Sequence, residues 1–306
     1  MRGHLRLKSP LRQMGLFLGL FCLLYIFTGV FSIIVYKSSG IDVEHIEKVD
    51  WNNNQVIAVF KIVQALSSVL LFVLPVYIFA RFTFTGNYRY FLGFRNAEKA
   101  NMYVLAVVGI LLALPFVFWL GDLNQKIPLP DQLIKMEEQS SLQMAAFLKI
   151  RSTLDIVINV FIIALLPAIC EELFFRSVLQ RIIIQIARNP WAGIVITAVL
   201  FSSLHMQFLG FLPRMFLGIV LGAFYWFSGS IWTSIIAHFV NNAAQVMIAS
   251  YVPKYIDKNP ETPVLVALVC GIVVWAILWY FQKQSTITFS KVYNTDELTP
   301  TNQFMA

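Results

Sequence analysis

Charged and strongly polar side chains stand at only a few positions within the long apolar stretches of this sequence. The candidates for chemistry fall in three separate segments, which are CEELFFR with Glu171, Glu172 and Arg176, FSSLH with His205, and HFVNN with His238 and Asn242. An ionisable group inside a membrane segment is costly and commonly faces a bundle interior or a wet cavity. Three such segments in one chain therefore predict a shared functional site.

Hydrolysis of an acyl bond is the chemistry that these residue types suit. The carboxylate of Glu171 with the imidazole of His205 can take a proton from water. His238 and Asn242, four residues apart on one helix face, can hold a developing oxyanion. Alternatively, Glu171, His205 and His238 can supply three ligands to a catalytic Zn²⁺ and leave a fourth position for water. Both readings predict the same reaction and differ in what activates the water.

Helical spacing predicts different roles for the two glutamates. Glu172 and Arg176 are four residues apart, so they share a helix face and can form a structural ion pair. Glu171 is rotated from that face by about 100° and must find partners on other helices, with His205 as the leading candidate. Pro167 precedes it and is expected to kink the span and open room for water near the carboxylate.

In order and in spacing, these segments resemble the motifs of the CPBP family, which comprises type II CAAX proteases and Abi-like, bacteriocin-processing membrane proteases. The family pattern is E-E-x-x-x-R, then F-x-x-x-H, then H-x-x-x-N. It is matched by the two glutamates with Arg176, by Phe201 with His205, and by His238 with Asn242. One departure is Ser177, which stands where the family often has Gly.

The resemblance covers roughly residues 166–243 and implies an intramembrane endopeptidase whose active site opens toward the cytoplasmic side. Its implied partners are the lipid bilayer and a membrane-associated protein or peptide substrate. Family naming as a metalloprotease implies zinc, held by the three ligands named above. The resemblance does not name the substrate, because members process prenylated CAAX tails in eukaryotes and serve bacteriocin immunity or peptide maturation in bacteria.

Transmembrane helices are the elements that must position these residues. The 306 residues are 58% hydrophobic and only 13% charged, which is more apolar than a soluble domain requires. A span needs roughly 20 apolar residues. About eight are expected: Met14–Val35, Val56–Ala80, Met102–Leu120, Leu154–Cys170 with a helical continuation to Ala187, Trp191–Phe208, Phe211–Phe227, Ile231–Ser250 and Val264–Phe281. The sequence thus predicts an all-α polytopic membrane protein with its catalytic core in the C-terminal half.

Polarity divides the chain into three predicted parts. Residues 1–153 supply accessory transmembrane helices and, within 121–153, an interfacial helix; residues 154–281 form the catalytic core, and 282–306 a loose polar tail. Lys and Arg gather in alternate loops, which predicts both termini in the cytoplasm. The bacterial inner membrane is the expected location. The net charge of +7 is thereby explained without nucleic-acid binding.

The predicted depths of Glu171 and His205 in the membrane conflict with one another. Glu171 falls near the cytoplasmic end of its predicted span, whereas His205 lies about 21 Å deep if its helix begins at Trp191. Either that helix begins later, or Glu171 lies deeper than the apolar run suggests.

Two other functions remain open. A proton-coupled carrier also uses membrane Glu and His, and a scaffold would use the same groups as polar contacts between helices. A carrier is expected to repeat this polarity in its first half, where Lys61 is nearly the only buried ionisable residue. Ser234 shares a face with His238, a pairing better explained by packing than by a catalytic dyad. This asymmetry favours an enzyme.

Overall fold

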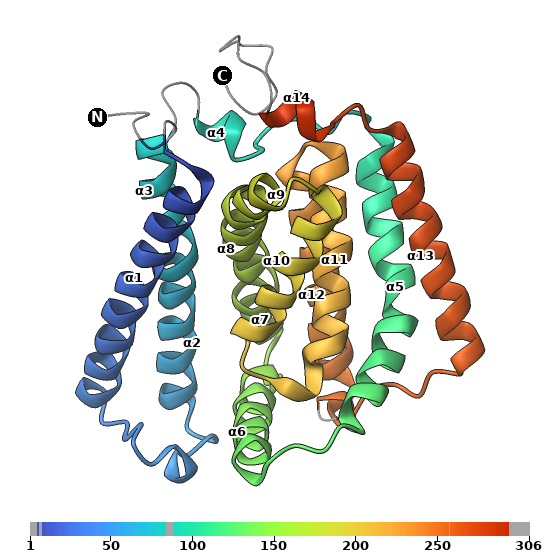
Figure 1. The fold of residues 1–306 in the computed structure, drawn as a ribbon. Helices are drawn as coiled ribbons and strands as arrows, with labels where there is room; N and C mark the ends of the chain where they lie inside the picture. Colours follow the sequence, from blue (N-terminus) through green and yellow to red (C-terminus); the bar gives the residue numbers. More distant parts are fainter. Residues whose placement is uncertain (1–4, 6–7, 84–87, 257, 294–306) are drawn as a thin grey trace.

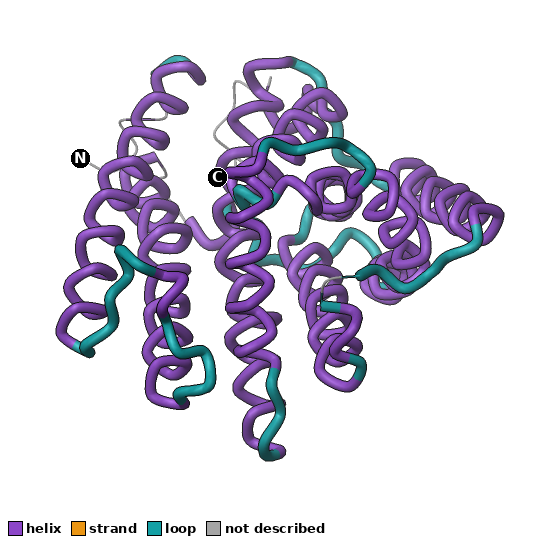
Figure 2. The backbone as a smooth tube through the Cα atoms, turned by 90° about the horizontal axis from the view of Figure 1, so that it is seen from below, coloured by secondary structure: helices purple, strands orange, loops and turns teal. Residues whose placement is uncertain are grey.

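Helices make up almost all of the described chain. The computed structural model describes residues 5, 8–83, 88–256 and 258–293, and within these ranges it contains helices and no strand (Figure 2). Six helices are long and apolar enough to cross a membrane. The prediction of an all-α integral membrane protein is therefore confirmed.

The N-terminal half supplies three long helical rods. The second rod is interrupted by the π-helical turn η3, and a surface helix closes this half. In chain order the elements are α1 (Pro10–Ser38), η2 (Ile46–Lys48), α2 (Asn54–Ser68), η3 (Val69–Val73), α3 (Leu74–Thr83), α4 (Tyr88–Phe91), α5 (Asn101–Gln125) and α6 (Asp131–Leu148).

The C-terminal half begins with a continuous 35-residue rod, Thr153–Ala187. Its parts are α7 (Thr153–Asn159), η4 (Val160–Leu165), α8 (Leu166–Glu172), η5 (Leu173–Gln180) and α9 (Arg181–Ala187). After it follow α10 (Pro190–Leu204), η6 (Phe208–Gly210), α11 (Phe211–Ser228), α12 (Ile231–Tyr251), η7 (Pro253–Tyr255), α13 (Val264–Gln284) and α14 (Phe289–Tyr293). The beginning of α1 and all of α14 lie at the same end of the bundle (Figure 1).

The predicted count of eight spans is not confirmed, although all eight segments are helical. The helix α10 has 15 residues, or about 22 Å, which is less than the roughly 30 Å of a hydrocarbon core. The helix α12 has 21 residues but is not among the six most apolar long helices, because it carries His238, Asn241, Asn242 and Gln245. Both exceptions belong to the part of the chain that carries the predicted site.

Two groups of buried apolar side chains hold the rods together. One joins α5 to α11, α12 and α13 through residues such as Ile110, Phe224 and Phe281. The other packs Phe17 of α1 and Phe79 of α3 against η5. The rod Thr153–Ala187 thus lies between the N-terminal helices and the C-terminal bundle. The helix α5, although within residues 1–153, packs inside the C-terminal core.

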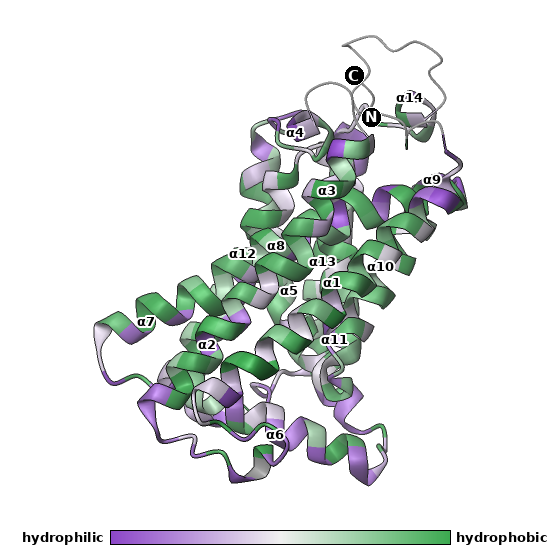
Figure 3. Cartoon of the chain, turned by 90° about the vertical axis from the view of Figure 1, so that its left-hand side faces the viewer, coloured by the Kyte–Doolittle hydropathy of each residue, from purple (hydrophilic) through white to green (hydrophobic). Residues whose placement is uncertain are grey.

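Hydrophilic residues gather at the two ends of the molecule, while the helices between them are hydrophobic (Figure 3). At one end lies α6, which begins directly after Pro130 and exposes Ile134 and Met136. The helix expected in residues 121–153 is therefore present at an end of the bundle.

The expectation of a loose tail is wrong for its described part. The tail packs on the bundle because apolar side chains recur within it: Ile287 and Val292 are buried. The Tyr293 hydroxyl donates to the Arg181 carbonyl at 2.8 Å, and its ring stacks on Trp226. The rest of the tail, residues 294–306, lies outside the described residues.

Candidate active site

Glu171 lies near the middle of the rod Thr153–Ala187, which includes the helical continuation to Ala187 that the sequence predicts. The apolar run ends at Cys170, but buried apolar side chains resume at Leu173, Phe174 and Phe175 and the helix continues. The charges therefore mark a polar point inside a span rather than its boundary. Glu171 and His205 line the same cavity, so the two residues lie at the same depth and their predicted positions no longer conflict.

Two π-helical segments flank the glutamates. The segment η4 ends at Leu165, directly before Leu166 and Pro167, and η5 begins at Leu173. Proline lacks the N–H that an α-helix needs, and π-helical turns are frequent at functional sites. A π-helical segment thus lies directly before Leu166 and Pro167, whereas the kink expected at Pro167 stays a prediction.

Glu172 contacts Arg176 on its own rod and His238 on α12. Its Oε2 lies 3.0 Å from Nε of Arg176, and both side chains are fully buried. Its Oε1 lies 3.0 Å from Nδ1 of His238 on α12. The ion pair expected from the four-residue spacing is present, whereas the second contact was missed, because spacing within one helix carries no signal about a partner on another.

Glu171 is the more accessible glutamate. Its Oε2 lies 3.8 Å from Nε2 of His238, and its side chain is 15% exposed. Together with His205, Phe72 and Leu204 it lines a cavity of about 110 Å³, which is large enough to hold water. The Glu171 carboxylate thus lies near two imidazoles, His238 of α12 and His205 at the end of α10.

His205 follows the last residue of α10. Its Nδ1 lies 2.8 Å from the carbonyl oxygen of Phe201. A carbonyl only accepts hydrogen bonds, so Nδ1 carries the proton and Nε2 of the neutral ring keeps a lone pair. The Phe201 ring also packs edge-on against His205 and His238, and the Arg176 guanidinium lies 5.1 Å from its centroid. The phenylalanine of the F-x-x-x-H motif therefore supports both imidazoles.

Asn242 lies one helical turn beyond His238 and is half-buried. Its Oδ1 accepts a hydrogen bond from Nδ2 of Asn241 at 3.1 Å, which leaves its own amide hydrogens to donate. The structure brings Glu171, His205 and His238 together. Within the described part of the chain, no recorded hydrogen bond joins Asn242 to those three.

The placement of the His, Cys, Asp and Glu side chains bears on whether the site can hold a metal ion. A zinc ion needs its nitrogen and oxygen ligands within about 2.0–2.2 Å. Across residues 5, 8–83, 88–256 and 258–293, no group of three or more His, Cys, Asp or Glu side chains is arranged to hold a metal ion. The assignment of Glu171, His205 and His238 as ligands of Zn²⁺ stays a prediction.

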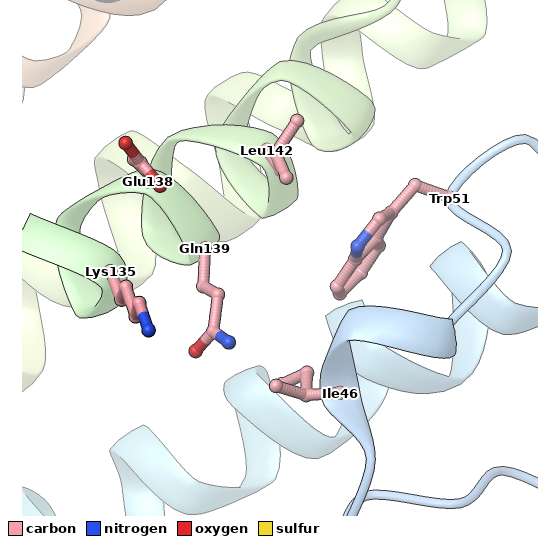
Figure 4. A pocket seen from close by; sticks show the side chains of 6 residues that line it. All are labelled: Ile46, Trp51, Lys135, Glu138, Gln139 and Leu142. Atoms are coloured by element: carbon pink, nitrogen blue, oxygen red, sulfur yellow. The ribbon is translucent and has the colours of Figure 1, made fainter. Parts of the chain in front are cut away.

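A larger cavity, of about 300 Å³, lies between η2 and α6 (Figure 4). The residues that line it are Ile46, Trp51, Lys135, Glu138, Gln139 and Leu142. None of them belongs to the predicted site, and no histidine or cysteine is among them. The smaller cavity, in contrast, combines a carboxylate and an imidazole, so chemistry rather than size identifies the candidate site.

Comparison with protein families confirms the resemblance inferred from the motifs. Residues 153–244 match the family model described as type II CAAX prenyl endopeptidase, Rce1-like. This segment is less than a third of the chain, and it begins at the first residue of α7 and ends within α12. All three motifs fall within it. The comparisons with curated proteins and with solved structures find no match.

Proposed function

From the premise that residues 153–244 form an Rce1-like segment, we propose that the chain is an intramembrane endopeptidase. It hydrolyses a peptide bond of a membrane-associated protein or peptide, and the family name favours a prenylated CAAX tail as the substrate class. One observation carries the proposal: the Glu171 carboxylate lines a cavity with His205 and lies 3.8 Å from His238. The coarser conclusion, a protease in a membrane, rests on the family match.

Glu171 and His205 activate the attacking water. A water in their cavity can donate one hydrogen bond to the Glu171 carboxylate and another to Nε2 of His205, because Nδ1 of that ring donates to the Phe201 carbonyl. Glu171 takes the proton as the water oxygen attacks the substrate carbonyl carbon. The carbonyl oxygen then becomes an oxyanion.

His238 and Asn242 stabilise that oxyanion. Nδ1–H of His238 donates to Glu172, so Nε2 must gain a proton before it can donate. Glu171 can supply the proton taken from water across the Oε2 to Nε2 separation of 3.8 Å, a contact that tightens when substrate binds. The imidazolium and the free amide N–H of Asn242 then donate to the oxyanion.

Collapse of the tetrahedral intermediate completes the reaction. The carbon–nitrogen bond breaks, and the proton held on Glu171 or His238 passes to the leaving amine nitrogen. The products are a new carboxyl terminus and a free amine. Glu171 returns to its charged form, so the cycle needs no further reactant.

A comparison of membrane peptides tests the proposal. Wild-type chain and Glu171→Gln are produced at equal levels, and membrane peptides are compared by mass spectrometry. We expect at least one peptide to be shortened only with the wild type. That reporter peptide is then placed with purified chain in vesicles, where a protease cleaves it and a carrier moves solute instead. Identical peptides in both samples contradict the proposed function.

A further inference from the structure

The loop that follows His205 connects α10 to α11. This loop, residues 206–210, includes the single 3-10 turn η6, and its first residue, Met206, has a φ of 53°. A positive φ is uncommon for a residue other than glycine. His205 lies after the last helical turn of α10, so the backbone beyond it has to be held by other elements.

Asn124 of α5 holds this backbone at two points. Its Nδ2 donates to the carbonyl of Phe208 at 2.7 Å, and its Oδ1 accepts from the N–H of Leu212 at 2.7 Å. The carbonyl only accepts and the N–H only donates, so the amide has a single orientation that satisfies both. The Asn124 side chain is buried.

Other contacts hold the same backbone from other directions. The Ser202 hydroxyl donates to the Phe211 carbonyl at 2.7 Å, and Arg214 hydrogen bonds to Gln207. These contacts lie within the α10–α11 hairpin. Glu137 of the surface helix α6 accepts from the N–H of Leu209. Asn124 instead belongs to α5, whose residues pack in the core with α11, α12 and α13, so it fixes the hairpin relative to that core.

We propose that Asn124 is a positioning residue for His205. By holding the backbone at residues 208 and 212, it sets where the His205 imidazole lies relative to Glu171 in the cavity that both line. The inference rests on the proposed function, in which these two groups activate water. A misplacement of about 1 Å in such a pair can lower a rate by about a hundredfold.

Two variants and one control test the proposal. Asn124→Leu has a similar size and loses both hydrogen bonds, whereas Asn124→Asp keeps the acceptor for Leu212 and loses the donor to Phe208. Asn259→Ala is the control, because Asn259 donates to Asp122 at the same end of α5. Among the described residues, Asn259 makes no hydrogen bond to the loop 206–210. Each protein is assayed in vesicles for kcat and KM on the reporter peptide and for amide hydrogen exchange of residues 206–213.

We expect Asn124→Leu to lower kcat by about tenfold to a hundredfold with KM within about threefold, and to speed exchange in the loop. Asn124→Asp gives a smaller change of the same kind, and Asn259→Ala behaves as wild type. Normal kcat despite faster loop exchange, unchanged exchange, or a change in KM alone overturns the proposal. Failure of both Asn124 variants to fold also overturns it, because the role is then structural.

The same assay separates this inference from the proposed function. If Glu171→Gln cleaves the reporter peptide at the wild-type rate, the proposed function fails. If Glu171→Gln is inactive and Asn124→Leu keeps its kcat, only the positioning role of Asn124 fails.

Discussion

At the residue scale, the carboxylate of Glu172 makes two contacts, one through each oxygen. One oxygen pairs with Arg176, and the other receives the Nδ1 hydrogen bond of His238. The first contact concerns stability, since each charge would be costly to bury alone. The second concerns chemistry, since the partner of one ring nitrogen decides what the other can do.

Removal of Arg176 is predicted to lower the amount of folded protein. Arg176→Ala leaves the buried Glu172 carboxylate without its cationic partner, and breaking a buried ion pair costs about 3–5 kcal/mol. Folded yield in detergent is the measurement, with Arg188→Ala as control because Arg188 is exposed. Equal folded yields for both variants would show that the pair does not stabilise the fold.

Replacing both Glu172 and Arg176 distinguishes the contribution of the ion pair from that of the contact between Glu172 and His238. Glu172→Leu with Arg176→Met replaces the ion pair by apolar side chains, a change that is often neutral or stabilising. We expect folded yield to recover, whereas cleavage stays at least about a hundredfold below wild type, because His238 has lost the acceptor for Nδ1. Recovery of both properties would leave Glu172 with a structural role alone.

Metal removal addresses the alternative way of activating water. Zinc held by Glu171, His205 and His238 is a prediction from the sequence, and their placement does not match a ligand set. We therefore expect purified protein to cleave the reporter peptide at an unchanged rate after treatment with a chelator. Loss of cleavage on chelation, with recovery on adding Zn²⁺, would establish the metal-dependent reading.

At the element scale, close approach of α10 and α11 brings His205 to the rod. A Cβ atom on Gly218 would lie 2.9 Å from Cβ of Ala198 on α10, which is too close for a real contact. The glycine is thus required by packing, and Gly218 with Gly222 forms a G-x-x-x-G pattern, which lets helix backbones approach closely.

Gly218→Ala is predicted to destabilise the protein even though alanine favours helices. Overpacking costs about 1–3 kcal/mol and pushes α10 away from α11. The control is Gly29→Ala, because a Cβ atom there meets nothing within 4 Å. Thermal unfolding in detergent should show a lower Tm for Gly218→Ala only. A Tm at or above that of wild type would contradict the packing argument.

Apolar runs predicted where the helices lie, but not what happens at charged positions within them. The predicted span Val264–Phe281 corresponds closely to α13, Val264–Gln284, because its composition is uniform. The apolar run ends at Cys170 although the rod continues to Ala187 as predicted, because hydropathy treats charge as a boundary even where the charge is paired inside a helix. The motif spacing predicted the candidate residues, of which Glu171, His205 and His238 lie together. The contact between Glu172 and His238 depends on tertiary packing that one sequence does not encode locally.

At the scale of the whole molecule, the bundle places α14 and the beginning of α1 at one end and α6 at the other. The distribution of Lys and Arg predicts that the first end faces the cytoplasm. Reporter fusions at Asn53, before α2, and at Lys291, in α14, should therefore report opposite sides of the membrane. The same side for both would contradict the predicted topology.

Glu171→Gln tests the central claim most directly, because the change removes a charge and adds no bulk. Glu171 is partly exposed to the cavity, and the buried pair of Glu172 and Arg176 is left intact. Folded yield and cleavage of the reporter peptide in vesicles are measured side by side with wild type. We predict a normally folded protein whose cleavage is abolished, whereas a normally folded Glu171→Gln that cleaves at the wild-type rate would contradict the account.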